Sequence, residues 1–124
     1  MLIALIVESN LDFAWLLFDF IKRNTRYHAL HVRNAQGALQ FIGCIKPDLF
    51  IIDYQLPDMS GMELYQQLQV GKAAKGVPIL MIDSTFPQAI GLARDMVKTA
   101  LLFDEDEFIA AIEVLLAPHE ISSQ

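Results

Sequence analysis

Cysteine is nearly absent from this chain, since Cys44 is the only one among 124 residues. A single thiol excludes an internal disulfide, so the fold cannot depend on disulfide cross-links. A chain of this kind suits a reducing compartment, and we expect it in the cytoplasm. Cys44 lies among apolar residues at helical spacing, and we therefore predict that it is a buried thiol of the core.

Long hydrophobic runs are also absent. The first seven residues, Met1 to Val7, are apolar, but this run is too short to cross a bilayer and lacks the basic start of a signal peptide. We interpret it as a buried strand and expect no membrane association. Five prolines and six glycines leave no room for a long linker. We predict one domain over residues 1–118 and a short polar tail over 119–124.

Basic residues are missing from the last 26 residues, where six Asp and Glu account for the whole net charge of −6. Phosphate contacts need Lys and Arg, so we expect no nucleic-acid-binding surface in this region. The charge permits a basic protein partner. The alternative, which we favour for most of the cluster, is that Asp104 to Glu107 complement the positive end of a helix dipole.

The most informative stretch runs from Lys46 to Leu64 and reads KPDLFIIDYQLPDMSGMEL. Four apolar residues after Pro47-Asp48 predict a strand buried on both faces, and this strand stops at Asp53. The carboxyl ends of parallel strands form the ligand crevice of an open α/β sheet. A carboxylate there is a candidate nucleophile or metal ligand. The alternative is that Asp53 only ends a strand or starts a turn.

Apolar runs alternate with amphipathic segments along the whole chain, which predicts a parallel sheet with helices on both faces. The predicted strands are 2–7, 29–33, 49–52, 78–82 and 99–103, and the predicted helices are 11–24, 35–42, 60–70, 87–96 and 106–116.

Three side chains outside the main motif invite an interpretation. The helix over 11–24 is apolar beyond one stripe, and we predict that Trp15 is buried within the domain rather than against a partner. His28 and His31 are three residues apart in a short strand, so they face opposite sides. We interpret them as surface or edge residues and not as a metal site.

The order of elements, together with PDLFIIDYQLPDMSGMEL, resembles a two-component response-regulator receiver domain over essentially the whole chain. The resemblance implies a flavodoxin-like (βα)5 three-layer sandwich with a five-stranded parallel sheet in the order 2-1-3-4-5. It also implies that a sensor histidine kinase or a phosphotransfer protein passes a phosphoryl group to the Asp at the end of strand 3. By resemblance, this phosphoacceptor is Asp53.

The family's metal site is only partly present here. Receiver domains hold Mg²⁺ with two acidic residues after strand 1, the phosphoacceptor and a backbone carbonyl two residues beyond it. By resemblance these positions are Glu8 and Ser9, Asp53, and the carbonyl of Gln55. Ser9 therefore replaces the acid that binds the metal most directly. Mg²⁺ prefers hard oxygen ligands, so we expect a weakened site.

The family's other two site residues are not matched by the same residue types. The Ser or Thr at the end of strand 4 falls on Asp83, and Ser84 or Thr85 could replace it only if the strand register shifts by a residue or two. The Lys at the end of strand 5 has no counterpart, because no Lys or Arg follows Lys98. Lys98 could reach the site only in another register. Glu8, Asp53 and Asp83 would then share one edge, so one carboxyl should have a raised pKa or a cation should bind.

Two hypotheses follow for function. In the first, the domain accepts a phosphoryl group on Asp53 with reduced efficiency. In the second, it is a pseudo-receiver that acts without phosphorylation as an interaction or dimerisation module, pairing through strand 99–103 and the last helix. We expect no enzyme activity on a small substrate, because the sequence has no P-loop, nucleophile elbow or HExxH motif.

Overall fold

A computed structural model describes residues 1–71 and 73–82 of the chain. These residues form four strands, β1 (Leu2–Val7), β2 (Tyr27–Val32), β3 (Leu49–Asp53) and β4 (Ile79–Ile82). All pair in parallel, in the order β2-β1-β3-β4. Three helices connect them, α1 (Leu11–Asn24), α2 (Ala35–Phe41) and α3 (Gly61–Val70). The observed order confirms the predicted 2-1-3-4 arrangement as far as the described residues extend.

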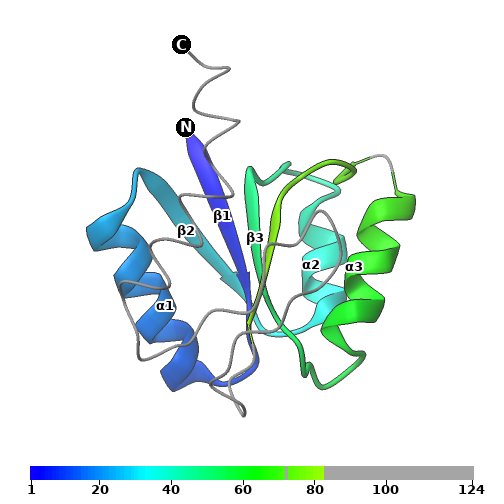
Figure 1. Ribbon diagram of the computed structural model, residues 1–124, viewed down its shortest axis with the longest axis horizontal. Coiled ribbons are helices and arrows are strands. Elements are labelled where there is room, and N and C mark those ends of the chain that lie inside the picture. The colour runs from blue at the N-terminus through cyan, green and yellow to red at the C-terminus, as the bar shows by residue number, and fades with distance from the viewer. Residues whose placement is uncertain (72, 83–124) are drawn as a thin grey trace.

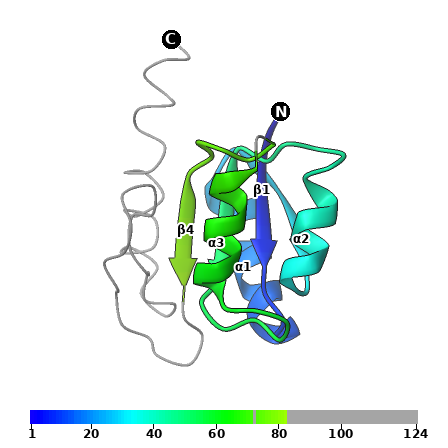
Figure 2. The same cartoon turned by 90° about the vertical axis from the view of Figure 1, so that its right-hand side faces the viewer.

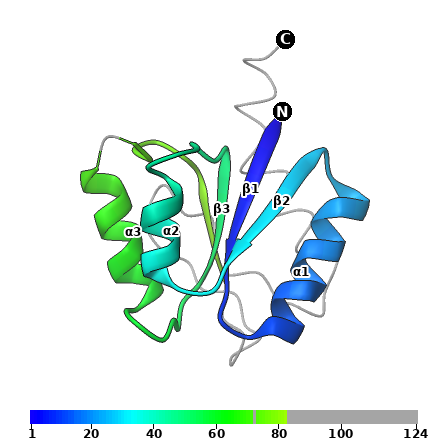
Figure 3. The ribbon, with the colours of Figure 1, turned by 180° about the vertical axis from the view of Figure 1, so that it is seen from behind.

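The helices cover both faces of the sheet. Helix α1 lies on one face, and α2 and α3 lie together on the other, with the sheet between them in Figure 1 and in the reverse view of Figure 3. Turning the molecule by 90° shows β1 and β4 running in the same direction, with α3 in front (Figure 2). This is the expected result of crossovers that join parallel strands.

The core divides into two clusters because successive strand residues point to opposite faces of the sheet. Ile51 packs on the α1 side, whereas its neighbours Phe50 and Ile52 pack on the α2–α3 side. Every residue of β3 and β4 is buried, which explains why these strands read as continuous apolar runs rather than as alternating ones.

The helix boundaries follow from their caps. The Asn10 side chain accepts from the N–H of Phe13 at the start of α1, and Ser60 accepts from Glu63 N–H at the start of α3. Helix α1 has the predicted bounds. Strand β2 starts at Tyr27, two residues earlier than predicted, because Tyr27 pairs with Leu2 at the beginning of β1.

Two burial predictions are wrong. Trp15 is 68% exposed, because the residues that α1 buries against the sheet are Ala14, Leu17 and Ile21, and the Trp15 ring contacts Phe18 edge to face. Cys44 is exposed, since α2 ends at Phe41 and the thiol lies in the turn beyond it.

Several predictions fall on residues outside the described part of the chain. They are the strand over 99–103, the helices over 87–96 and 106–116, and the boundary at residue 118, which all stay predictions. Within residues 1–71 and 73–82, no helix has both the length and the apolar character needed to cross a bilayer.

Candidate phosphoacceptor site

The register of the sheet brings Glu8 beside Asp53. Strands β1 and β3 pair so that Val7 stands opposite Ile52, and the next residue of each strand is an acid. Both side chains lie at the carboxyl edge of the sheet, and both are almost completely buried, with exposures of 0% for Glu8 and 1% for Asp53. The predicted cluster of acids at this edge is therefore present for these two residues.

Both the backbone and the side chain of Glu8 form hydrogen bonds with their surroundings. Its N–H donates to the carbonyl of Val32 at 3.1 Å, which extends the ladder between β1 and β2 by one residue. One carboxylate oxygen, Oε2, accepts a hydrogen bond from the N–H of Asn10 at 3.0 Å. The other, Oε1, is buried and accepts no hydrogen bond from any residue in the described part of the chain. An unsatisfied buried carboxylate oxygen needs a proton or a cation.

The electrostatics of the pair agree with that geometry. The pKa of Glu8 is raised from its ordinary value of 4.5 to about 8. The largest cause is burial, which disfavours the charged form. The hydrogen bond that protonated Glu8 makes with the Asp53 side chain raises the pKa as well, and so does the negative charge of Asp53. The N–H groups of Asn10 and Ser9 have the opposite effect. The expectation that one carboxyl at this edge has a raised pKa is confirmed.

The turn after β3 orients Asp53. Its Oδ1 accepts a hydrogen bond from the N–H of Gln55 at 3.0 Å. The carbonyl of Tyr54 accepts from the N–H of Gly61 at 2.7 Å, so the first turn of α3 is held directly against the end of β3. Gln55 also pairs with Ser60 across the turn. The Leu-Pro-Asp-Met-Ser-Gly sequence thus closes a loop on the strand end that carries Asp53.

Asp58, at the tip of this turn, reaches a second helix. Its Oδ1 accepts from the N–H of Ala35 at 3.0 Å and its Oδ2 from the N–H of Gln36 at 2.9 Å, at the start of α2. Desolvation at this contact raises the pKa of Asp58, but the backbone hydrogen bonds outweigh it, and the net effect is a lowered pKa. The turn is therefore tied to the N-terminus of α2 as well as to α3, and the sequence did not predict this contact.

We expect Asp58→Ala to destabilise the domain at pH 7 by about 1 kcal/mol, as for the loss of a helix N-cap. A group with a lowered pKa stabilises the fold above its unfolded pKa of 3.8, and this stabilisation disappears as the pH falls through the folded value. Urea denaturation at pH 7 and pH 3 measures both effects. If the free energy of unfolding of the variant differs from that of the wild type by the same amount at the two pH values, the Asp58 carboxylate is not the group that stabilises the turn.

Three of the predicted site residues cannot be placed. Asp83, Ser84 and Lys98 lie outside the described residues. Ile82, the last residue of β4, stands opposite Asp53 in the ladder, and its carbonyl accepts from the N–H of Tyr54 at 2.7 Å. The roles of the three residues stay predictions.

The described residues are suited to a divalent cation but do not complete a site for it. Glu8 and Asp53 offer hard oxygen ligands, and the unsatisfied Oε1 of Glu8 gains a partner if a cation binds. Within residues 1–71 and 73–82, no three His, Cys, Asp or Glu side chains converge as a metal site. By resemblance to the family, the predicted third protein ligand is the backbone carbonyl of Gln55.

Sequence reasoning missed a contact of His31. The prediction that both histidines are surface or edge residues is confirmed, because both lie on β2 at the edge of the described sheet, where His28 is exposed and His31 is half-buried. Its Nε2 lies 2.8 Å from the backbone carbonyl of Glu8. The strand register could have indicated this proximity, because Val32 is opposite Val7.

Known proteins match the chain along most of its length. The response regulator receiver domain family matches residues 4–99. The polar-differentiation response regulator DivK of Brucella anthropi is 30% identical over 79 residues, which make up 64% of this chain and 63% of DivK. The phosphate regulon transcriptional regulatory protein PhoB of Pseudomonas aeruginosa is 38% identical over 56 residues, or 45% of this chain and 24% of PhoB.

The chain spans less than two thirds of these relatives' lengths, and only 23% of the protein-glutamate methylesterase/protein-glutamine glutaminase of Geobacillus kaustophilus, to which it is 28% identical.

Solved structures show the same fold. The signal receiver domain of a signal transduction histidine kinase from Syntrophus aciditrophicus superposes with a TM-score of 0.77 at 23% identity, covering 95% of this chain and 92% of that one. A CheY-like response regulator receiver domain from Methylobacillus flagellatus gives 0.75 at 21% identity, with coverages of 93% and 98%. These identities are low, so the two structures support the flavodoxin-like fold alone.

Proposed function

Because this chain belongs to the response regulator receiver domain family, a family of two-component signalling domains, we propose that it accepts a phosphoryl group on Asp53. The observation that carries this proposal is the placement of Asp53. It stands at the carboxyl end of β3, its Oδ1 is held by the N–H of Gln55, and it lies beside Glu8. The turn, the strand end and the neighbouring acid all converge on this one carboxylate.

The chemistry assigned to the site is transfer of a phosphoryl group to a carboxylate. An oxygen of Asp53 attacks phosphorus and forms an acyl phosphate, while the donor's leaving atom departs with the electron pair of the broken P–N or P–O bond. A bound Mg²⁺ would neutralise charge on the transferring oxygens. Glu8, Asp53 and the Gln55 carbonyl are the residues that would hold it. The donor is proposed to be a sensor histidine kinase or a phosphotransfer protein.

Reduced efficiency is part of the proposal. Ser9 stands where the family has a second acid, so the site lacks one anionic ligand for Mg²⁺. The proton that Glu8 holds near neutral pH also competes with the cation for the same oxygen. Both features weaken metal binding without removing the nucleophile.

A second candidate function is a pseudo-receiver that works through protein contacts without phosphorylation. The specific observation in its favour is the exposed apolar surface of α1, where Leu11, Trp15 and Leu16 are 48%, 68% and 58% exposed. The strand over 99–103 and the last helix are a further proposed pairing surface. Either function is that of a signalling domain, and we propose no enzymatic turnover of a small substrate.

The test is phosphorylation of the intact chain by a small-molecule donor. We expect incubation with Mg²⁺ and acetyl phosphate to add one phosphoryl group, detected by mass spectrometry. Asp53→Asn should abolish the adduct, because an amide oxygen is a poor nucleophile. Asp19→Asn is the matched control, since Asp19 is an exposed acid of α1 that pairs only with Arg23 in the described residues. This control should be phosphorylated like the wild type.

Trp15 provides a second measurement, because it is the only tryptophan in the chain. We expect Mg²⁺ and beryllofluoride to change its fluorescence in the wild type and in Asp19→Asn, but not in Asp53→Asn. An adduct that persists in Asp53→Asn would assign the phosphate to another residue. If the wild type forms no adduct and shows no Mg²⁺-dependent signal, the pseudo-receiver function is the correct one. In that case sedimentation at high concentration should detect self-association.

A further inference from the structure

We propose that His31 is a positioning residue of the Asp53 site, which holds the backbone of Glu8 so that the Glu8 carboxyl stays beside Asp53. The proposal deepens the function proposed above and rests on it. The observation that carries it is the contact between the His31 ring and the Glu8 peptide. It joins β2 to the acidic edge through a side chain.

Only one direction of the hydrogen bond is chemically possible in this contact. Nε2 of His31 lies 2.8 Å from the backbone oxygen of Glu8. A carbonyl oxygen only accepts hydrogen bonds, so Nε2 must carry a hydrogen and donate it. The imidazole has an Nε2–H in one neutral tautomer and in the charged form, so the contact does not depend on whether the ring is charged.

The contact lies where the regular ladder stops. The N–H of Glu8 still donates to the carbonyl of Val32, but β2 ends at Val32 and the chain then turns into the cap of α2 at Asn34. His31 therefore supplies a side-chain donor to the Glu8 carbonyl at the end of the two strands. The backbone of Glu8 is therefore hydrogen-bonded to β2 twice, through its N–H to the carbonyl of Val32 and through its own carbonyl to the side chain of His31.

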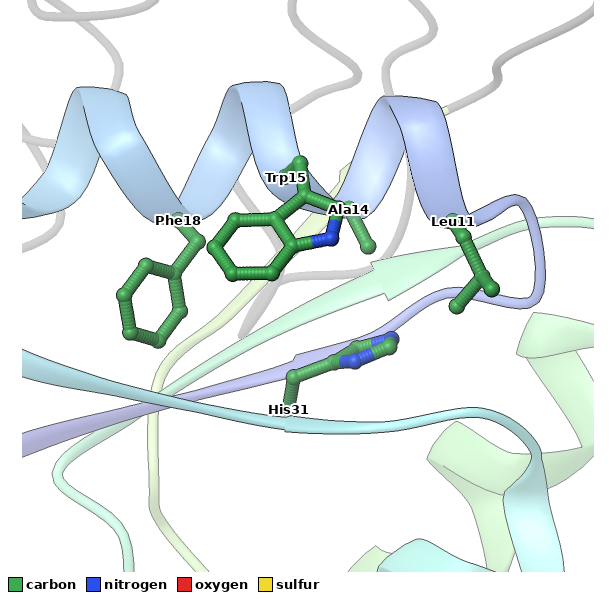
Figure 4. Close-up of a pocket in the computed structure, with 5 residues that line it drawn as sticks. All are labelled: Leu11, Ala14, Trp15, Phe18 and His31. Carbon is green, nitrogen blue, oxygen red and sulfur yellow. The ribbon is translucent and has the colours of Figure 1, made fainter.

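The surroundings of His31 show why a polar ring is unusual there. It lies under α1 in a pocket of about 290 Å³, lined otherwise by Leu11, Ala14, Trp15 and Phe18. Figure 4 shows the ring rising from the strand toward the helix, with Trp15 and Phe18 on one side and Leu11 on the other. An aliphatic or aromatic residue would fill this apolar site well. An imidazole is suited to it through the donor that it directs at Glu8.

Glu8 needs such a restraint. Its carboxyl is completely buried next to a second acid, and both burial and Asp53 disfavour its charge. A charged carboxylate in that position lowers its free energy by rotating toward water, away from Asp53. Fixing the peptide on both sides, with Oε2 on the Asn10 N–H, limits this movement and keeps two oxygen ligands together for the cation.

The test compares His31→Phe, which keeps the ring but removes the donor, with His31→Gln, whose side-chain N–H is the same number of bonds from the backbone as Nε2. We expect His31→Phe to raise the Mg²⁺ dissociation constant roughly three- to tenfold, as for one lost hydrogen bond. His31→Gln should restore most of the affinity. His28→Gln is the matched control, since His28 is exposed on the same strand, and it should bind Mg²⁺ like the wild type.

A measurement without metal separates this proposal from the proposed function. Hydrogen exchange of the Asn10 N–H reports how firmly the Glu8 carboxylate is held, and we expect it to accelerate severalfold in His31→Phe but not in His31→Gln or His28→Gln. If no variant or wild type binds Mg²⁺ and this pattern is seen, the phosphoacceptor function fails and His31 still positions Glu8. Unchanged exchange and unchanged Mg²⁺ affinity in His31→Phe would overturn the positioning role.

A measurement on the wild-type protein covers the case in which His31→Phe does not fold. The nitrogen chemical shifts of the ring should identify Nε2 as protonated, with a slowly exchanging N–H. A neutral ring protonated at Nδ1 alone would overturn the proposal, because such a ring cannot donate to the Glu8 carbonyl.

Discussion

Replacing Gly61 with alanine is expected to destabilise the domain by about 3 kcal/mol or more, at the upper end of overpacking effects. A Cβ at this position would lie 2.5 Å from the carbonyl oxygen of Asp53, 2.9 Å from Cα of Tyr54 and 2.9 Å from Sδ of Met81. Two of these atoms belong to the backbone of β3 and its turn, so they cannot move aside as a flexible side chain can. The start of α3 would have to move away from the strand.

This displacement should also impair the site. The N–H of Gly61 donates to the carbonyl of Tyr54, and that contact helps to close the turn on Asp53. We therefore expect the folded fraction of Gly61→Ala to be phosphorylated more slowly than the wild type. Urea denaturation gives the loss of stability, and the acetyl phosphate reaction gives the loss of activity.

Gly71→Ala is the matched control for this substitution. Gly71 follows α3 with φ of −74°, and among the described residues an added Cβ would meet only the carbonyl of Gln67, at an ordinary contact distance of 3.6 Å. Its free energy of unfolding should change by less than about 1 kcal/mol, and any increase should come from the reduced freedom of the unfolded chain. A Gly61→Ala protein as stable as Gly71→Ala would show that the approach of α3 to β3 is not tight.

Replacing Glu8 with glutamine is expected to remove the pH dependence that this residue imposes on the free energy of unfolding. The folded pKa of Glu8, about 8, lies above its ordinary value of 4.5, so between these values the folded state binds more protons than the unfolded state. Unfolding then releases protons, and the free energy of unfolding falls as the pH rises through this window. The slope is at most about 1.4 kcal/mol per pH unit for one proton.

Glu8→Gln should lack this contribution. A glutamine can still accept from the N–H of Asn10 and can donate to Asp53, but it does not titrate. Without metal, the variant should match the wild type near pH 5 and become more stable than it at pH 8 and above. Urea denaturation in a chelating buffer across pH 5 to 9 measures this. Parallel pH profiles for the two proteins would show that Glu8 is already ionised in the folded state at pH 5.

Mg²⁺ adds a control to the same experiment. A cation binds the deprotonated carboxylate, so it should stabilise the wild type most at high pH and should stabilise Glu8→Gln less. Equal stabilisation of the two proteins would place the cation away from Glu8.

Much of this fold could be predicted because the signals are local. The apolar runs at 2–7 and 49–52, and the helix over 11–24, depend only on near neighbours in the chain, and the structure confirms them. Asp53 at the end of β3 is likewise a property of its own strand. Its role as phosphoacceptor came from the resemblance of the surrounding motif and stays a proposal.

The structure was needed wherever residues far apart in sequence meet. Trp15 is exposed and Cys44 lies in a turn, because burial depends on which helix face meets the sheet and on where the helix ends. The contacts of Asp58 with α2 and of His31 with Glu8 each join residues 22 or more positions apart. The residues around Asp58 and around His31 do not include their partners, so no local sequence pattern could have indicated these contacts.

The acidic edge shows the same division. The order and types of its residues, and the absence of Lys and Arg after Lys98, can be read directly from the chain. That Glu8 is buried level with Asp53, keeps one oxygen unsatisfied and has a raised pKa depends on the register of β1 with β3 and on the packing around them. Burial and distance determine the energy of a charge, and these exist only once the strands have assembled.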